Sequence, residues 1–314
     1  MLTAKDTTRI RTLIVRWYRT HHRPFPWRVA HPDPYLIFVS EVMLQQTQAA
    51  RVAELLPVFL RRFPDVEALA RAGNAEVIQA WKGLGYNNRA LRLRNAARII
   101  VDEHDGVVPK DQEALLALPG LGPYASASIT TFAYDTRTVV LDVNIRRVFS
   151  RLIEGPGKST GVSKNSTLSN GDSTTLSDGE LHEIALQLLP VRASASEWYN
   201  AVMELGATVC QARSAKCDVC PVRKACASAQ NVGSMTSPKK KEPEFRNEPR
   251  RLWRGRVVQV LREHPAGLHR RVAVRLVFGS TTSEELRFVD DLLARLTKDG
   301  LVAVDEAQII RLPH

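Results

Sequence analysis

The sequence contains no run of about 18 consecutive apolar residues, the length that a membrane span needs. Its first residues, Met-Leu-Thr-Ala-Lys-Asp, lack the apolar core of a secretory signal peptide. Cysteine is scarce as well: there are 4 in 314 residues, all between Cys210 and Cys226. Cysteines confined to one short segment cannot cross-link distant parts of a fold. We therefore exclude a membrane-spanning protein and a disulfide framework, and we expect a soluble intracellular protein of the cytoplasm, nucleoid or nucleus.

Positive charge, in contrast, is abundant. The chain has 44 Lys and Arg against 33 Asp and Glu, a net charge of +11 and a pI near 9.8. A basic surface of this kind favours a polyanionic partner such as nucleic acid. With 44% hydrophobic residues, the chain can bury a sizeable core, and its length allows two or three domains.

Apolar residues repeat at helical spacing along most of the chain, which predicts an all-α fold. Between residues 5 and 19, for example, Ile10, Leu13, Ile14 and Trp17 share one face. Further helices are expected at 35–50, 51–63, 66–72, 76–81, 90–102, 112–118, 146–152, 180–189 and 197–209.

The helical pattern breaks twice. Residues 154–178 are rich in Ser, Thr, Gly and Asn and predict a flexible insertion. Residues 229–249 form a basic linker that includes Lys239-Lys-Lys241, which is either a solvated linker or a strap that contacts phosphates. Residues 250–314 then predict three short helices, at 252–264, around 268–277 and at 283–300, and a two-stranded wing at 301–304 and 309–312. This winged-helix-like module suits either DNA or a protein partner, and the sequence does not decide between them.

A glycine-rich turn, Leu118-Pro-Gly-Leu-Gly-Pro-Tyr124, precedes an acid in the run Val140-Leu-Asp-Val-Asn-Ile-Arg146. Gly120 and Gly122 leave backbone N–H groups uncovered where a helix begins, and such a helix end binds phosphate. A dinucleotide-binding turn is disfavoured, because residues 112–118 predict a helix instead of a strand and a third glycine is missing.

The cysteines follow the spacing Cys210-x6-Cys217-x2-Cys220-x5-Cys226. Four thiolates on one compact loop suit either a [4Fe–4S] cluster or a structural zinc ion, and spacing alone does not separate the two.

Several motifs together resemble one enzyme family. They are the hairpin turn, the cysteine spacing, Pro26-Trp-Arg28, Ser40-Glu-Val-Met-Leu-Gln-Gln-Thr-Gln48, Gly83-Leu-Gly-Tyr86 and Met203-Glu-Leu-Gly-Ala207. This combination is similar to the adenine DNA glycosylase (MutY) family of the helix-hairpin-helix, or endonuclease III, superfamily. The resemblance implies a six-helix domain at 26–134 that carries the hairpin. It also implies an iron-sulfur cluster domain made from 1–25 and 135–228, with a [4Fe–4S] cluster held by the four cysteines.

The resemblance further implies a reaction and its catalytic residues. A monofunctional glycosylase would flip out a mispaired adenine, opposite 8-oxoguanine or guanine, and hydrolyse its N-glycosidic bond in base excision repair. Glu41 would protonate the adenine at N7 and Glu204 would support it; Asp142 would stabilise the oxocarbenium-like sugar with Asn144 orienting it. Tyr124 stands where the superfamily's lyases carry a Schiff-base lysine, so we expect no lyase activity.

The resemblance also implies the contacts with DNA. The expected partner is double-stranded DNA with a mispaired or damaged base, bound by a monomer, and Arg89 is expected to hold phosphate. The residues implied in DNA or base binding are Trp27, Arg28, Leu44, Gln45, Gln46, Thr47, Tyr86, Arg89, Gly120 and Gly122. Asn87 and Asn88 depart from the family pattern, and the C-terminal region is too short and too helical for the Nudix-like domain that recognises 8-oxoguanine. Strictness for 8-oxoguanine is therefore left open.

Two alternatives remain. One is a thymine or uracil mismatch glycosylase of the same superfamily, although Gln45-Gln46 matches the adenine branch better. The other is a non-catalytic iron-sulfur regulator that binds DNA. A regulator that does not catalyse a reaction would have no common role for the three carboxylates Glu41, Asp142 and Glu204.

Overall fold

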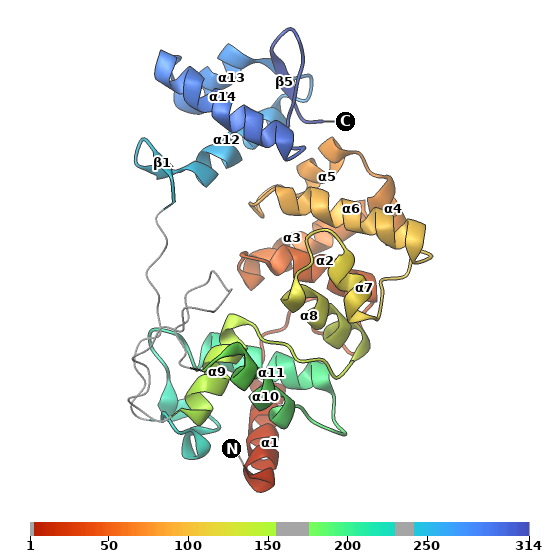
Figure 1. The fold of residues 1–314 in the computed structure, drawn as a ribbon, viewed down its shortest axis with the longest axis vertical. Helices are drawn as coiled ribbons and strands as arrows, with labels where there is room; N and C mark the ends of the chain where they lie inside the picture. Colours follow the sequence, from red (N-terminus) through yellow and green to blue (C-terminus); the bar gives the residue numbers. More distant parts are fainter. Residues whose placement is uncertain (1–2, 155–175, 230–241, 314) are drawn as a thin grey trace. The chain divides into compact units, whose positions relative to one another are not determined.

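The computed structural model describes residues 3–154, 176–229 and 242–313 (Figure 1). Most of the expected insertion at 154–178 and Lys239 to Lys241 lie outside these ranges. The fold is helical, as the sequence predicted, and it divides into two compact units. The first comprises residues 1–24, 28–32 and 122–240, and the second comprises residues 25–27, 33–121 and 241–314.

The first unit is built around one buried helix. Helix α11 (Ala195–Thr208) contacts α1 (Ala4–His21), α8 (Pro123–Tyr134) and α9 (Val143–Ile153). Helix α10 (Asp178–Leu188) packs against α9 and α1. Two short 3-10 turns, η1 (Cys217–Val219) and η2 (Arg223–Ala225), follow α11; η1 begins at Cys217, and Cys220 and Cys226 directly follow η1 and η2. The aromatic rings of Trp198 and Phe149 stack in the core, with centroids 6.4 Å apart.

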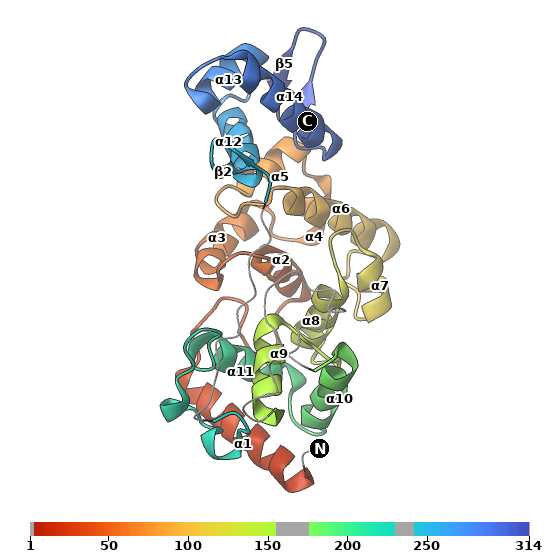
Figure 2. The same ribbon diagram turned by 60° about the vertical axis from the view of Figure 1, so that its left-hand side comes forward.

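The second unit contains the remaining N-terminal helices. They are α2 (Pro34–Leu44), α3 (Ala49–Arg62), α4 (Val66–Arg71), α5 (Asn74–Ala80), α6 (Asn88–Glu103) and α7 (Gln112–Ala117). Helix α6 packs along α4 and also contacts α5 and α2 (Figure 2). Phe59 and Trp81 meet edge to face in this core, at a centroid distance of 5.8 Å. We refer to these helices as the six-helix part.

The same unit includes the C-terminal module, residues 242–313. Its elements are β1 (Glu244–Phe245), β2 (Glu248–Pro249), α12 (Arg250–Glu263), β3 (Leu268–His269), α13 (Arg270–Phe278), α14 (Ser283–Lys298), β4 (Ala303–Val304) and β5 (Ile309–Arg311). The expected three helices and the β4–β5 wing are present. A third strand, β3, joins the sheet in the antiparallel order β3-β5-β4.

The C-terminal module and the six-helix part share one apolar core. Ile78 of α5 and Leu91 of α6 belong to the cluster that buries Trp253, Val258 and Leu292 of the module. Hydrogen bonds seal the same junction: both Arg262 and Gln79 bind backbone carbonyls across it. Because the module and the six-helix part bury apolar side chains against each other, the module belongs to the second unit and is not a separate domain joined only by a linker.

Two expected boundaries were wrong. The helix predicted at 35–50 ends at Leu44, and a turn separates it from α3, because Gln46 adopts a left-handed conformation with φ +58°. Leu268 and His269, expected to begin a helix, instead pair with β5. In both cases contacts with distant segments override the local periodicity.

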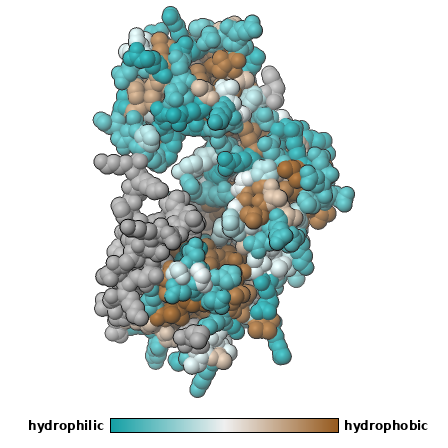
Figure 3. All heavy atoms as spheres, in the orientation of Figure 1, coloured by the Kyte–Doolittle hydropathy of each residue, from teal (hydrophilic) through white to brown (hydrophobic). Residues whose placement is uncertain are grey.

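Positive charge is largely neutralised in residues 242–256, the described end of the basic linker together with the start of α12. The arginines of this stretch each form an ion pair with a nearby acid: Arg246–Glu285, Arg250–Asp291, Arg251–Glu242, Arg254–Asp299 and Arg256–Glu248. The visible face of the module is mostly hydrophilic (Figure 3). Within the described ranges, none of the helices has the length and apolarity needed to span a bilayer.

Candidate active site and DNA-contacting surface

The hairpin turn uses its two glycines differently. Gly120 has φ +85°, and a Cβ added there would lie 2.9 Å from the Cβ of Arg92, so this position requires glycine. Gly122 has φ −101° and nothing within 4 Å of an added Cβ; it serves as the N-cap of α8, with Pro123 in the first turn. The prediction of a glycine turn that opens a helix is therefore confirmed.

Asp142 is the N-cap of α9. Its Oδ1 accepts a hydrogen bond of 2.6 Å from the backbone N–H of Ile145, and its Oδ2 accepts one of 2.9 Å from Nδ2 of Asn144. Desolvation raises the pKa of Asp142 above its ordinary value, although these hydrogen bonds and the charge of Arg147 act in the opposite direction. The carboxyl group of Asp142 is thus fixed in orientation and poorly hydrated. A group of this kind can stabilise positive charge that forms next to it during a reaction.

A chain of hydrogen bonds fixes Asn144 in turn. Its Oδ1 accepts from Nη2 of Arg147 at 2.7 Å, which sets the orientation of the amide and directs its NH₂ toward Asp142. Arg147 also donates to the carbonyls of Gly206 and Cys210, at 2.9 and 2.8 Å. Gly206 lies against this group, since an added Cβ would be 2.7 Å from the Cβ of Asn144. The side chains of Asn144 and Arg147 thus link the carboxyl group of Asp142 to Cys210, where the cysteine segment begins.

Glu41 lies in α2, in the second unit, and its side chain is buried with 5% exposure. Most of the residues buried near it in the helix are apolar, among them Phe38, Val42 and Met43, although the polar Ser40 is buried as well. An apolar setting disfavours the ionised form of a carboxyl group.

Glu204, which is expected to support Glu41, has ion-pair partners of its own in the first unit. It is fully buried in α11 and forms ion pairs of 2.7 Å with both Arg23 and Arg28. Burial by itself raises the pKa of Glu204, but the hydrogen bonds from the two arginines outweigh it and hold the pKa below its ordinary value. Glu204 is therefore ionised, and the two arginines balance its charge. These ion pairs hold the segment that contains Arg23 and Arg28 against α11.

Arg28, expected in a base pocket, is thus engaged with Glu204, and its guanidinium lies 5.8 Å from the ring of Tyr18. Trp27 is 9% exposed and stacks on Phe25 at 4.9 Å. The half-buried Tyr124 donates its hydroxyl to the sulfur of Met203 at 3.9 Å.

Arg89, expected to hold phosphate, instead binds the backbone of two loops in the second unit. One is the turn at the end of α2, and the other contains Leu84 and Gly85. The buried guanidinium of Arg89 donates to the carbonyls of Val42, Met43 and Gln45 on one side, and to those of Leu84 and Gly85 on the other. Thr47 joins the network: it accepts from Arg89 and donates to Leu84. Desolvation lowers the pKa of Arg89 to about 10.

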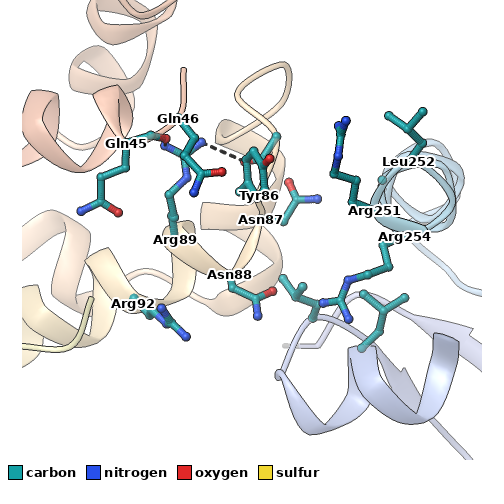
Figure 4. A pocket seen from close by; sticks show the side chains of 14 residues that line it. Gln45, Gln46, Tyr86, Asn87, Asn88, Arg89, Arg92, Arg251, Leu252 and Arg254 are labelled. Atoms are coloured by element: carbon teal, nitrogen blue, oxygen red, sulfur yellow. Dashed lines mark hydrogen bonds between the residues drawn. The ribbon is translucent and has the colours of Figure 1, made fainter. Parts of the chain in front are cut away.

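The loops that Arg89 holds present polar and aromatic groups outward (Figure 4). Tyr86 is 47% exposed, and both Tyr86 and Gln46 have positive φ, at +44° and +58°. Left-handed backbone at a residue other than glycine is strained, and such strain concentrates at functional loops. Gln45 donates to the carbonyl of Gly120 at 3.2 Å, and Leu44, half-buried, is the last residue of α2.

The four cysteines line a common hollow in the first unit. Cys210, Cys217, Cys220 and Cys226 are each half-buried and free. Burial, together with the charges of the other three thiols, raises the pKa of Cys220 to about 11, so all four cysteines lie within electrostatic reach of one another. Arg151 crosses the hollow, donating to Sγ of Cys210 at 3.4 Å and to the carbonyl of Gln211 at 2.8 Å. Across the described residues, no three side chains meet the spacing for a single metal ion.

Sequence reasoning missed Arg23 and Arg147, although both hold expected site residues in place. Their signal is weak, because the sequence shows them as two arginines among many, and their partners Glu204 and Gly206 lie far along the chain.

Comparison with known proteins gives a consistent result. Residues 39–166 match the HhH-GPD superfamily of base excision DNA repair proteins. The adenine DNA glycosylase of Mycobacterium tuberculosis H37Rv is 37% identical over 285 residues, covering 90% of this chain and 88% of that protein. A thymine/uracil-DNA glycosylase of Methanothermobacter thermautotrophicus is 28% identical, covering 68% and 90%. Among solved structures, a thermostable thymine-DNA glycosylase superposes with a TM-score of 0.62 at 27% identity, covering 73% of this chain and 98% of that one.

Proposed function

Because the chain belongs to the adenine DNA glycosylase family of the helix-hairpin-helix superfamily, we propose that it excises adenine from mispairs in double-stranded DNA during base excision repair. The opposite base would be 8-oxoguanine or guanine. The target base is stacked inside the duplex, so the enzyme must extrude it before the glycosidic bond can be reached.

The geometry of Asp142 is the observation that carries this proposal. Hydrogen bonds from Ile145 and Asn144 hold both carboxylate oxygens, so the group cannot rotate away from positive charge on a deoxyribose. Poor hydration strengthens the attraction between this anion and the oxocarbenium-like sugar of the transition state. Catalysis requires Asp142 in its ionised form.

We assign the opposite protonation state to Glu41. Adenine leaves readily only after N7 is protonated, and Glu41 is a buried carboxyl group whose neighbours in α2 are mostly apolar. Glu41 would therefore be the proton donor to the base. Glu204 would act indirectly, by fixing Arg23 and Arg28.

The enzyme would be monofunctional. Tyr124 stands at the position that a Schiff-base lysine occupies in the lyases, and a phenol cannot form an imine with the sugar. The product would be an intact strand with an abasic site. Rapid strand cleavage without alkali, with a borohydride-trapped adduct, would contradict this assignment.

The four cysteines fit a [4Fe–4S] cluster, because four soft thiolates line one hollow. Cys210, Cys217, Cys220 and Cys226 would hold the cluster, which would supply structural order to the loop and no step of the hydrolysis. Arg213 and Lys216, both exposed between the first two ligands, would contact DNA phosphates, as would the start of α8. A brown protein with broad visible absorption is expected; a colourless protein that contains zinc would overturn this assignment.

The decisive experiment is single-turnover excision followed by alkaline strand cleavage, with wild type and Asp142→Asn. The substitution keeps the size of the side chain but removes the charge, so the rate should fall about 10²- to 10³-fold while DNA binding is retained. Asp178→Asn is a matched control, since Asp178 is half-exposed and pairs with Arg146. If Asp142→Asn excises adenine at the wild-type rate, the proposed role is wrong.

A thymine or uracil mismatch glycosylase is the second candidate. The similarity to a thymine/uracil-DNA glycosylase, and to the solved structure of a thymine-DNA glycosylase, favours it. Duplexes with A, T or U opposite guanine separate the two: faster removal of T or U than of A would replace the first proposal with the second.

A further inference from the structure

The outer side of α13, in the C-terminal module, carries an exposed apolar ridge. Val272 and Leu276 are 47% and 52% exposed and lie one helical turn apart. In the part of the chain that the structure describes, no other helix carries two large apolar side chains that are exposed. Single apolar residues scattered over a surface need no explanation, but a contiguous apolar ridge beside charged residues marks a candidate interaction site.

Arg271 and Arg275 form a second row beside this ridge, again one turn apart. Both are exposed, and neither forms an ion pair with a residue that the structure describes, whereas the adjacent Arg270 pairs with Asp290. Like charges at positions i and i+4 of a helix repel each other. Carboxylates of a partner would relieve this repulsion. We refer to the apolar row and the basic row together as the α13 face.

The rest of the module holds α13 in place from behind. The helix packs against α12, α14, β3 and β5, and Ala273 and Val274 on its inner side are buried in the core of the module. Its C-terminal end is closed by Gly279, which has φ +77° and donates its N–H to the carbonyl of Arg275. The α13 face is therefore formed before any partner arrives, which lowers the entropic cost of binding.

The elements by which winged-helix modules contact DNA are acidic in this chain. Such modules read bases with the N-terminal residues of the recognition helix, which corresponds here to α14, and its first turn contains Glu284 and Glu285. The wing between β4 and β5, residues 305–308, contains Asp305 and Glu306 and no basic residue. Carboxylates at both elements repel DNA phosphates. These charges favour a protein partner for the module over DNA.

We propose that the α13 face is the docking site for an acidic amphipathic helix of a partner protein. The apolar side of that helix would pack on Val272 and Leu276, and its carboxylates would pair with Arg271 and Arg275. A phosphate backbone would use the arginines but gain nothing from the apolar ridge, whereas an acidic amphipathic helix uses both rows. The C-terminal module thus joins the enzyme to a second protein, whichever base the enzyme excises.

The test titrates the full-length protein with two fluorescent synthetic helical peptides. Both carry leucine at every third or fourth position, flanked by glutamates in one peptide and by lysines in the other. Wild type should bind the glutamate peptide more tightly, by about 10-fold or more, and Arg271→Glu/Arg275→Glu should reverse the order. Leu276→Gln should weaken binding of the glutamate peptide about 3- to 10-fold at both low and high salt, because it removes an apolar contact from a residue position where glutamine is also a good helix former.

A matched control is needed because the whole chain is basic, with a net charge of +11, and an acidic peptide is attracted to all of it. Arg61→Glu/Lys298→Glu makes the same change in charge at two exposed positions, one in α3 and one in α14 beside α6. This control variant should keep the wild-type preference for the glutamate peptide. Thermal unfolding verifies that every variant is folded. The same preference in Arg271→Glu/Arg275→Glu as in the control variant overturns the proposal.

Two other occupants of the α13 face give different results. If the face contacts DNA, Arg271→Glu/Arg275→Glu weakens duplex binding and lowers its salt dependence more than the control variant does. If a second copy of the chain occupies it, sedimentation shows a dimer that Leu276→Gln dissociates. We expect equal duplex affinities for the two double variants and the same sedimentation for wild type and Leu276→Gln. Either of the other results overturns the proposal of a partner protein.

Discussion

At the scale of single residues, the candidate site consists of charges whose surroundings are set by neighbouring polar groups. Asp142 is held by an amide, and that amide is held by Arg147. Glu204, a residue of the same type in the same unit, meets two arginines and is neutralised. Partners, more than residue type, decide which carboxylate is available for chemistry.

Removal of the Asn144 amide should change the pH dependence of excision. The hydrogen bond from Asn144 lowers the pKa of Asp142, so its loss in Asn144→Leu raises that pKa further. Because Asp142 must be ionised, the acid limb of the single-turnover rate should move to higher pH by about one unit. Asn200→Leu, whose amide binds a carbonyl within α11, is the control and should keep the wild-type profile. An unchanged acid limb in Asn144→Leu would show that another group controls it.

At the scale of elements, loop conformation depends on a buried cation. Helix α2 ends at Leu44 and the following turn is strained, yet Arg89 binds carbonyls on this turn and on the Gly85 loop. The backbone conformations of Gln46 and Tyr86 therefore depend on a residue that faces away from solvent.

Arg89→Met should accordingly destabilise the protein. The methionine fills similar volume but leaves several buried carbonyls without a donor, at a cost of about 2–4 kcal/mol in the free energy of unfolding. Urea denaturation measures this cost. Arg61→Met, at an exposed position of α3, should change stability by no more than about 0.5 kcal/mol. Equal stability of the two variants would mean that the carbonyls find other partners.

The start of α14 is held by an ionised carboxylate. Hydrogen bonds from Ser280 and from the backbone N–H of Thr282 lower the pKa of Glu285 to about 2, and Arg246 pairs with the same group. The folded pKa thus lies below that of an unfolded glutamate, about 4.3. The stabilisation is complete above the unfolded pKa and is lost as pH falls through about 2.

Glu285→Gln should therefore have a lower melting temperature than wild type at neutral pH, and the difference should shrink as pH falls toward 2. Glu284→Gln is the matched control, because Glu284 is exposed in the same helical turn. A difference that stays constant from pH 7 to about 2 would contradict the role of the charge.

At the scale of the whole molecule, the sequence predicted what depends on local spacing. Helical periodicity, the turn at Gly120 and the cysteine segment all follow from near neighbours in the chain. The roles of Arg23, Arg89, Arg147 and Arg262 did not, because these arginines bind carbonyls and carboxylates that folding brings from distant segments. In the composition, each of these arginines counts only as one positive charge, whether it is buried or exposed. The docking of the C-terminal module was not predicted for the same reason.

That docking can be tested through Arg262. Burial lowers its pKa to about 10, and its hydrogen bonds join α12 to Ile78 and Asn87. In wild type, amides of α12 should exchange with deuterium about as slowly as those of α5 and α6, because they share one core. Arg262→Met removes bonds from a charged donor, so exchange in α12 should become about 10- to 100-fold faster. The exposed Arg287→Met should leave exchange unchanged. Fast exchange of α12 already in wild type would show that the module opens independently of the six-helix part.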